Sequence, residues 1–137
     1  MEAERGFPEL LQVVLDTTNV RGLAEFYRQL LGFRYRPGDE EASPGEDWLV
    51  LRDAAGHSRL AFQLVSELPE ATWPEGPRPQ QLHLDLKVRT AEQFDVQDER
   101  ARALGARLLF DRSDDPVEPL RVYADPAGHP FCIFVAS

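Results

Sequence analysis

Two kinds of hydrophobic spacing alternate along the chain, and they predict strands and helices in a repeating order. Residues Leu10 to Asp16 are mainly Val and Leu, which is typical of a strand. From Val20 to Leu31 the apolar residues recur every three or four positions, which is the spacing of one helix face. Gly32 is then expected to end the helix. Further strands are predicted over residues 33–36, 48–52 and 59–65.

The second half of the chain follows the same plan. A strand is predicted over Leu82–Val88, a helix that begins with the capping box Thr90 and Gln93 follows, and Gly105 ends it. Strands are then predicted near 107–110, 120–123 and 131–135. We therefore expect one α+β domain over residues 1–137, made of two βαβββ repeats at about 9–66 and 80–136. A stiff linker with several prolines, 67–79, joins them.

Short motifs repeat between the two halves at an offset of 71 to 73 residues. Each copy falls on the same kind of predicted element, which indicates two homologous half-domains with a site between them. The matched pairs are Leu11-Gln12 with Leu82-His83, Leu31-Gly32 with Leu104-Gly105, and Asp53-x-Ala55-Gly56-His57 with Asp125-x-Ala127-Gly128-His129.

Composition narrows the class of protein. The net charge of −9 argues against a nucleic-acid partner, and no apolar run reaches the roughly 20 residues of a membrane span. A lone cysteine, Cys132, excludes an internal disulfide and fits a cytoplasmic protein. The acidic, turn-rich segment 37–47 has no hydrophobic periodicity, and its composition predicts mobility.

Strand alternation predicts which side chains face the helices and which face a concave surface. Along Leu82–Lys87 the leucines share one face, while His83, Asp85 and Lys87 share the other. Residues expected to be buried towards the helices include Leu11, Val13, Leu15, Leu82, Leu84, Leu86, Ile133 and Val135, and also Leu60, Phe62 and Leu64. The opposite, concave surface is expected to display Gln12, Asp16, Gln63, His83, Asp85, Lys87, Cys132 and Phe134.

The paired modules carry two motifs, Phe26-Tyr27-x-x-Leu30-Leu31-Gly32-Phe33 and Asp125-Pro126-x-Gly128-His129. With these, the chain resembles the vicinal oxygen chelate superfamily, which includes glyoxalases, bleomycin-resistance proteins and extradiol dioxygenases. The resemblance implies cupped mixed sheets around a central cavity, and commonly a homodimer. Because its members include lyases, isomerases, dioxygenases and drug-binding proteins, the fold does not choose among these activities.

The resemblance also implies where a metal would bind. Metal-binding members use the first and last strands of each half, and here those positions hold Gln12, His83, Cys132 and either Ala61 or Gln63. Enzymatic members place a glutamate where this chain has Cys132. A set without a carboxylate suits neither hard cations nor structural zinc, so we expect no tightly held metal. A weakly bound divalent cation at Gln12 and His83 stays open.

His83 has two interpretations: a general base or ligand-binding group, or a side chain that hydrogen-bonds a neighbour. Trp48 and Trp73 could each stack on a flat ligand, and core packing is the alternative for Trp48. We expect a small-molecule-binding protein without a tight catalytic metal. The alternative is a glyoxalase-type lyase or isomerase that acts next to a carbonyl, with a metal or His83 as acid and base.

The residues expected to bind the ligand are Gln12, Asp16, Trp48, Gln63, His83, Asp85, Cys132 and Phe134. The expected partners are a small organic ligand and a second copy of the chain, with at least ~1,200 Å² buried between the copies.

Overall fold

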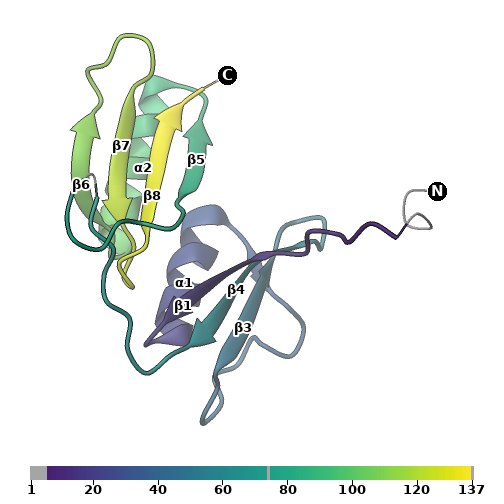
Figure 1. Ribbon diagram of the computed structural model, residues 1–137. Coiled ribbons are helices and arrows are strands. Elements are labelled where there is room, and N and C mark those ends of the chain that lie inside the picture. The colour runs from purple at the N-terminus through teal and green to yellow at the C-terminus, as the bar shows by residue number, and fades with distance from the viewer. Residues whose placement is uncertain (1–5, 74, 137) are drawn as a thin grey trace.

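The computed structural model describes residues 6–73 and 75–136, and these form two modules of the same design (Figure 1). The first module consists of β1 (Val13–Thr17), α1 (Val20–Leu31), β2 (Arg34–Tyr35), β3 (Trp48–Arg52) and β4 (Ser58–Leu64). The second consists of β5 (Leu84–Val88), α2 (Ala91–Leu104), β6 (Arg107–Arg112), β7 (Leu120–Ala124) and β8 (Pro130–Val135). The predicted α+β class and the two βαβββ repeats are confirmed.

The two sheets have the same strand order, β1-β4-β3-β2 and β5-β8-β7-β6. In each sheet the first strand of the module pairs parallel with the last, and the remaining pairs are antiparallel. Strands β1 and β5 are therefore both edge strands. Of the helices in the described residues, none is long and apolar enough to cross a membrane.

Local sequence sets the ends of both helices. The Asn19 side chain accepts a hydrogen bond from the Gly22 amide at 3.0 Å, and the Thr90 hydroxyl accepts one from the Gln93 amide at 3.1 Å. These bonds satisfy amides that lack partners in the first turn. Gly32 ends α1 with a φ of 71°, a left-handed conformation that glycine adopts without strain.

The two helices differ in how much of their surface is buried. In α2 the buried residues are Phe94 and Ala101. In α1 six residues are buried, and its Phe26 ring lies 5.9 Å from the ring of Phe131 in the second sheet. Helix α1 thus packs against the sheets of both modules, and a single hydrophobic core runs through them. The buried residues of α1 are Val20, Leu23, Ala24, Phe26, Tyr27 and Leu30.

A buried hydrogen bond joins the modules beside this core. The Tyr27 hydroxyl donates to Asp125 Oδ2 at 2.6 Å, and the other oxygen of Asp125 accepts the amides of Ala127 and His129. Burial and the neighbouring carboxylate raise the pKa of Tyr27 well above its usual value. The Nε2 atom of His129 lies 2.7 Å from the carbonyl oxygen of Asp16, so the turn also contacts β1.

The matching turn of the first module has the same internal bonds. Asp53 Oδ1 accepts the amides of Ala55 and His57, each at 3.0 Å. The side chains that stabilise the two turns are therefore the two aspartates. The motif Asp-x-Ala-Gly-His is therefore one turn that occurs twice, and only the second copy is buried against the other module.

Three of the residues expected to be buried are exposed. Leu11 and Leu82 are 67% and 53% exposed, because β1 and β5 begin two residues after them and no strand pairs with the preceding segments. The parallel pairing begins with Val13 and Leu60 in the first sheet and with Leu84 and Phe131 in the second, so neither Leu11 nor Leu82 is paired with the neighbouring strand. Leu64, at the end of β4, is 42% exposed. Within the paired segments the predicted alternation holds, and Leu84 and Leu86 pack on the core.

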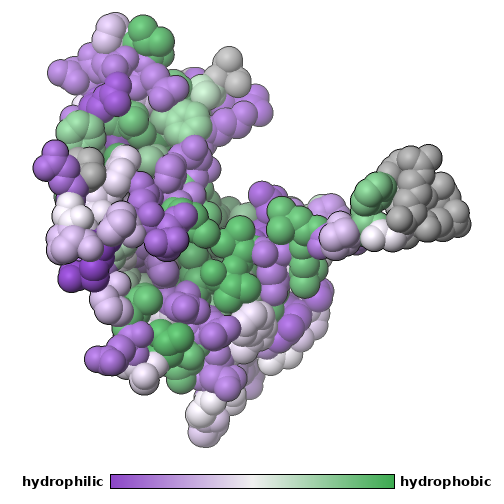
Figure 2. Space-filling view, viewed as in Figure 1, coloured by the Kyte–Doolittle hydropathy of each residue, from purple (hydrophilic) through white to green (hydrophobic). Residues whose placement is uncertain are grey.

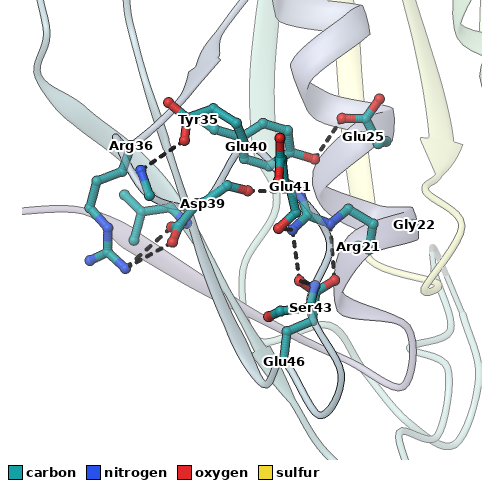
Figure 3. A network of polar contacts seen from close by, with 12 residues as sticks. Arg21, Gly22, Glu25, Tyr35, Arg36, Asp39, Glu40, Glu41, Ser43 and Glu46 are labelled. Carbon is teal, nitrogen blue, oxygen red and sulfur yellow. Dashed lines mark hydrogen bonds and ion pairs between the residues drawn. The ribbon is translucent and has the colours of Figure 1, made fainter.

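The acidic segment 37–47, for which the composition predicted mobility, is fastened to α1 (Figure 3). The Arg21 guanidinium binds both carboxylate oxygens of Glu46 at 2.9 and 2.7 Å, and it also donates to the carbonyl oxygens of Asp39 and Glu41. This ion pair lowers the pKa of Glu46. Since β3 begins at Trp48, directly after this segment, the Arg21 contacts also hold the start of β3 in place.

We predict a loss of stability at alkaline pH that depends on Tyr27. Its pKa in the folded state lies above the unfolded value of about 10, so the protonated phenol stabilises the fold, and this contribution is lost as the pH rises above 10. Urea unfolding between pH 8 and pH 11 should show a smaller decrease in the free energy of unfolding for Tyr27→Phe than for the wild type. Equal decreases would contradict the assignment.

We also predict that Arg21→Met releases segment 37–47. The variant keeps the aliphatic length but loses four hydrogen bonds, so limited proteolysis should cut within 37–47 at least several-fold faster than in the wild type. Arg36→Met is the matched control, since among the described residues the Arg36 side chain contacts the segment through Asp39 alone. Identical cleavage rates in Arg21→Met and the wild type would count against this role of Arg21.

Candidate functional site

Three side chains of different chemistry meet on the second sheet: His83, Asp85 and Cys132. Asp85 on β5 is paired in register with Cys132 on β8, so their side chains share the face that α2 does not cover. His83 immediately precedes β5, and its Nε2 atom lies 3.2 Å from Asp85 Oδ1. The nitrogen, oxygen and sulfur atoms of the three residues all lie within 4.8 Å of one another. The sequence placed His83 and Asp85 on the same face but did not predict that they touch. Their side chains do make contact in the structure.

Two residues outside the second sheet hold the His83 ring. The indole of Trp73 stacks on the imidazole, with ring centroids 6.1 Å apart and planes 19° from parallel. Gln80 Oε1 lies 3.2 Å from His83 Nδ1. The sequence indicated Trp73 as an aromatic residue that could stack on a flat ligand, but not that it stacks on His83, and it gave no signal for Gln80.

Cys132 is buried, with 4% of its surface exposed. Burial, and secondarily the charge of Asp85, raise the pKa of its thiol to about 11. The side chain is therefore a protonated thiol at neutral pH, and it is a poor nucleophile unless a cation displaces its proton.

The same face of the second sheet continues beyond this cluster. Lys87 is paired with Phe134, which is also in register with Leu120 of β7. Phe134 is half-buried and Lys87 is exposed. An apolar ring and an ammonium group thus lie one step along the strands from Asp85 and Cys132.

The equivalent face of the first sheet has no such acid, base or thiol cluster. There, Val14 pairs with Ala61 where the second sheet pairs Asp85 with Cys132. The register thus identifies Ala61, not Gln63, as the counterpart of Cys132. Further along, Gln63 is in register with both Asp16 and Trp48, and these three form a separate polar and aromatic group.

A groove of about 920 Å³ joins the two modules where β1 and β5 begin. Gln12 and Asp85 both line it, together with Leu11, Lys87 and Arg59. Figure 2 shows hydrophobic side chains gathered between the second module and the extended N-terminal segment. The structure therefore brings Gln12 to the same groove as Asp85, while Asp16, Gln63 and Trp48 lie along the first sheet.

One expectation about the metal ligands is wrong. The sequence placed no carboxylate among the candidate donors, but Asp85 lies beside both His83 and Cys132. These three residues form a candidate metal site with one nitrogen, one oxygen and one sulfur donor. The donor set does not fit a hard cation, because Mg²⁺ and Mn²⁺ prefer oxygen ligands and the thiol is a soft one.

A family model covers nearly the whole chain. The family model described as a glyoxalase-like domain matches residues 12–134. No curated protein is significantly similar to the chain.

Solved structures share the fold at low sequence identity. A glyoxalase/bleomycin resistance protein/dioxygenase family enzyme from Burkholderia phytofirmans PsJN has 21% identity and a TM-score of 0.68, and the match covers 95% of this chain and 100% of that one. A mutant of the fosfomycin resistance protein FosX from Listeria monocytogenes was solved with Mn(II) and 1S,2S-dihydroxypropylphosphonic acid. It has 18% identity and a TM-score of 0.69, over 96% of this chain and 94% of that one. A possible glyoxalase from Bacillus cereus has 16% identity and a TM-score of 0.63, over 93% and 98% of the two chains.

Proposed function

The chain belongs to the glyoxalase-like family of the vicinal oxygen chelate superfamily, and on that premise we propose that it binds a small organic molecule. The observation that carries the proposal is the cluster of His83, Asp85 and Cys132 on a sheet face that α2 leaves uncovered. Imidazole and carboxylate groups recognise polar atoms of a ligand, and the Phe134 ring beside them offers apolar contact. The proposed binding involves no hard cation such as Mn²⁺, because the nitrogen, oxygen and sulfur donors of the cluster do not suit one.

Both tryptophans of the chain lie beside the proposed binding surfaces, which supports a direct test. Trp73 stacks on His83, and Trp48 is in register with Gln63. A ligand on either sheet therefore changes the surroundings of a tryptophan. Intrinsic fluorescence can thus report binding without a label.

We predict that bleomycin, fosfomycin or the glutathione adduct of methylglyoxal quenches this fluorescence saturably. His83→Ala should weaken binding by about 5–20-fold, since it removes a hydrogen bond to the ligand while the exposed ring contributes little to the core. Glu92→Ala, on the exposed surface of α2, is the control and should leave affinity unchanged. No saturable quenching by any of the three compounds, or equal affinity in His83→Ala, would contradict the proposal.

A second candidate function is a lyase or isomerase of glyoxalase type. The observation that favours it is the orientation of His83, whose two ring nitrogens contact Gln80 and Asp85. An imidazole held in this way could move a proton next to a carbonyl group. Turnover of the methylglyoxal–glutathione adduct, lost in His83→Ala but retained in Glu92→Ala, would support this function over simple binding.

We further propose that a second copy of the chain completes the binding surface. Edge strands β1 and β5 both leave backbone groups unpaired along the groove, and the segment before β1 exposes apolar side chains. Leu10 and Leu11 are 91% and 67% exposed, which is unfavourable for large apolar side chains in water.

Sedimentation at micromolar concentration should therefore give a homodimer that buries at least ~1,200 Å² in total. Replacing Leu10 and Leu11 with Gln should raise the dimer dissociation constant by at least ~10-fold, because it removes apolar area from the interface. Replacing Val117, which is 90% exposed in the loop before β7, with Gln is the control. A monomeric wild type would contradict the proposal.

A further inference from the structure

Gln80 and Asp85 together determine what His83 can bind. When His83 donates its Nδ1 proton to Gln80 Oε1, the lone pair on Nε2 points towards Asp85 Oδ1, which is 3.2 Å away. Two acceptors that face each other need a positive centre between them, either a proton or a metal ion. Trp73 stacks on the ring, and Gln80 Oε1 accepts the Nδ1 proton in this tautomer, as partners of metal-binding histidines commonly do.

The third donor extends this arrangement towards a metal site. Cys132 Sγ lies within 4.8 Å of both the His83 nitrogen and the Asp85 oxygen. Ligand atoms around one tetrahedral Zn²⁺ lie roughly 3.3–3.7 Å apart, from bond lengths of about 2.0–2.3 Å. His83 and Asp85 are exposed, so rotation of their side chains can close the remaining distance. Cys132 is buried and supplies the fixed position.

We propose that His83, Asp85 and Cys132 bind a single Zn²⁺ with one coordination position left open to the solvent. Imidazole, carboxylate and thiolate are all zinc ligands, and three protein ligands with an open fourth position are typical of zinc sites that bind a further molecule. Binding releases the thiol proton of Cys132 to water. Zn²⁺ fits this set better than Mn²⁺, because the sulfur donor is soft.

The site belongs to the second module alone. The equivalent positions of the first module are Gln12, Val14 and Ala61, and two of these side chains have no donor atom. Asp85 is also not one of the positions at which metal-binding members of the superfamily resemble one another. The assignment therefore rests on this chain's own residues, and it predicts one ion per chain.

The test uses the full chain, treated with EDTA, dialysed and then loaded with Zn²⁺, Co²⁺ or Mn²⁺. We expect one Zn²⁺ per chain after a second dialysis, measured by elemental analysis, and no retained Mn²⁺. The Co²⁺ form should show a thiolate-to-cobalt charge-transfer band in the near ultraviolet. Cys132→Ser should abolish this band, and Asp85→Asn should weaken Zn²⁺ binding by at least 10-fold.

His57→Ala is the control, because His57 lies near Asp53 in the turn before β4, a histidine–aspartate pair without a cysteine. It should leave Zn²⁺ binding unchanged. The inference would be overturned if the wild type failed to retain Zn²⁺. It would also be overturned if Cys132→Ser and Asp85→Asn retained as much Zn²⁺ as the wild type. Circular dichroism checks that each variant is folded.

The inference deepens the proposed function by giving the binding surface an ion to which a ligand can attach. The two fail separately. Zn²⁺ retention is measured without any organic compound, and quenching by the three compounds is measured both with Zn²⁺ and after EDTA. A chain that retains Zn²⁺ but binds none of the compounds would overturn the proposed function alone. A chain that binds a compound but retains no Zn²⁺ would overturn this inference alone.

Discussion

The packing of α1 against both sheets is the interaction on which the rest of the structure depends. A short helix usually buries one face, as α2 does with Phe94 and Ala101. Helix α1 buries residues on a wider face, and its Phe26 and Tyr27 reach Phe131 and Asp125 of the second module. Phe131 lies on the helix-covered side of its sheet, where it stacks on Tyr123. The modules are therefore joined through their helix-covered sides, and the face of the second sheet that carries Asp85 and Cys132 lies opposite.

This arrangement explains why two similar halves carry different chemistry. The turn at Asp125 is buried because α1 covers it, whereas the same turn at Asp53 lies at the surface. A similar difference separates the uncovered faces: the second sheet pairs Asp85 with Cys132, and the first sheet pairs Val14 with Ala61. The reactive groups are thus concentrated on one module, and the other contributes Gln63, Asp16 and Trp48.

The sequence predicted the fold well because the information is local and occurs twice. Helix spacing, the Thr90 cap and the alternation within β5 depend on neighbouring residues, and all three are found in the structure. The burial of Leu11 and Leu82 was predicted wrongly because strand length depends on the partner strand. Pairing begins only at Val13 and at Leu84, and the alternation of residues in the sequence cannot reveal where it begins.

The candidate site was predicted less completely, for a related reason. His83, Asp85 and Cys132 were each assigned to the correct face, but their contact depends on side-chain rotation and on β5–β8 register. Trp73 and Gln80 reach His83 from a segment without periodicity, so no pattern in the sequence could place them.

The register of β5 and β8 also explains how a cysteine can occupy a position where enzymatic members of the superfamily place a glutamate. A buried thiol at Cys132 carries no charge at neutral pH, since burial raises its pKa. The negative charge comes instead from Asp85, which lies directly opposite on the neighbouring strand. The Asp85 carboxylate and the Cys132 sulfur therefore lie side by side on the face that α2 leaves uncovered, and this location combines a hard oxygen donor with a soft sulfur donor.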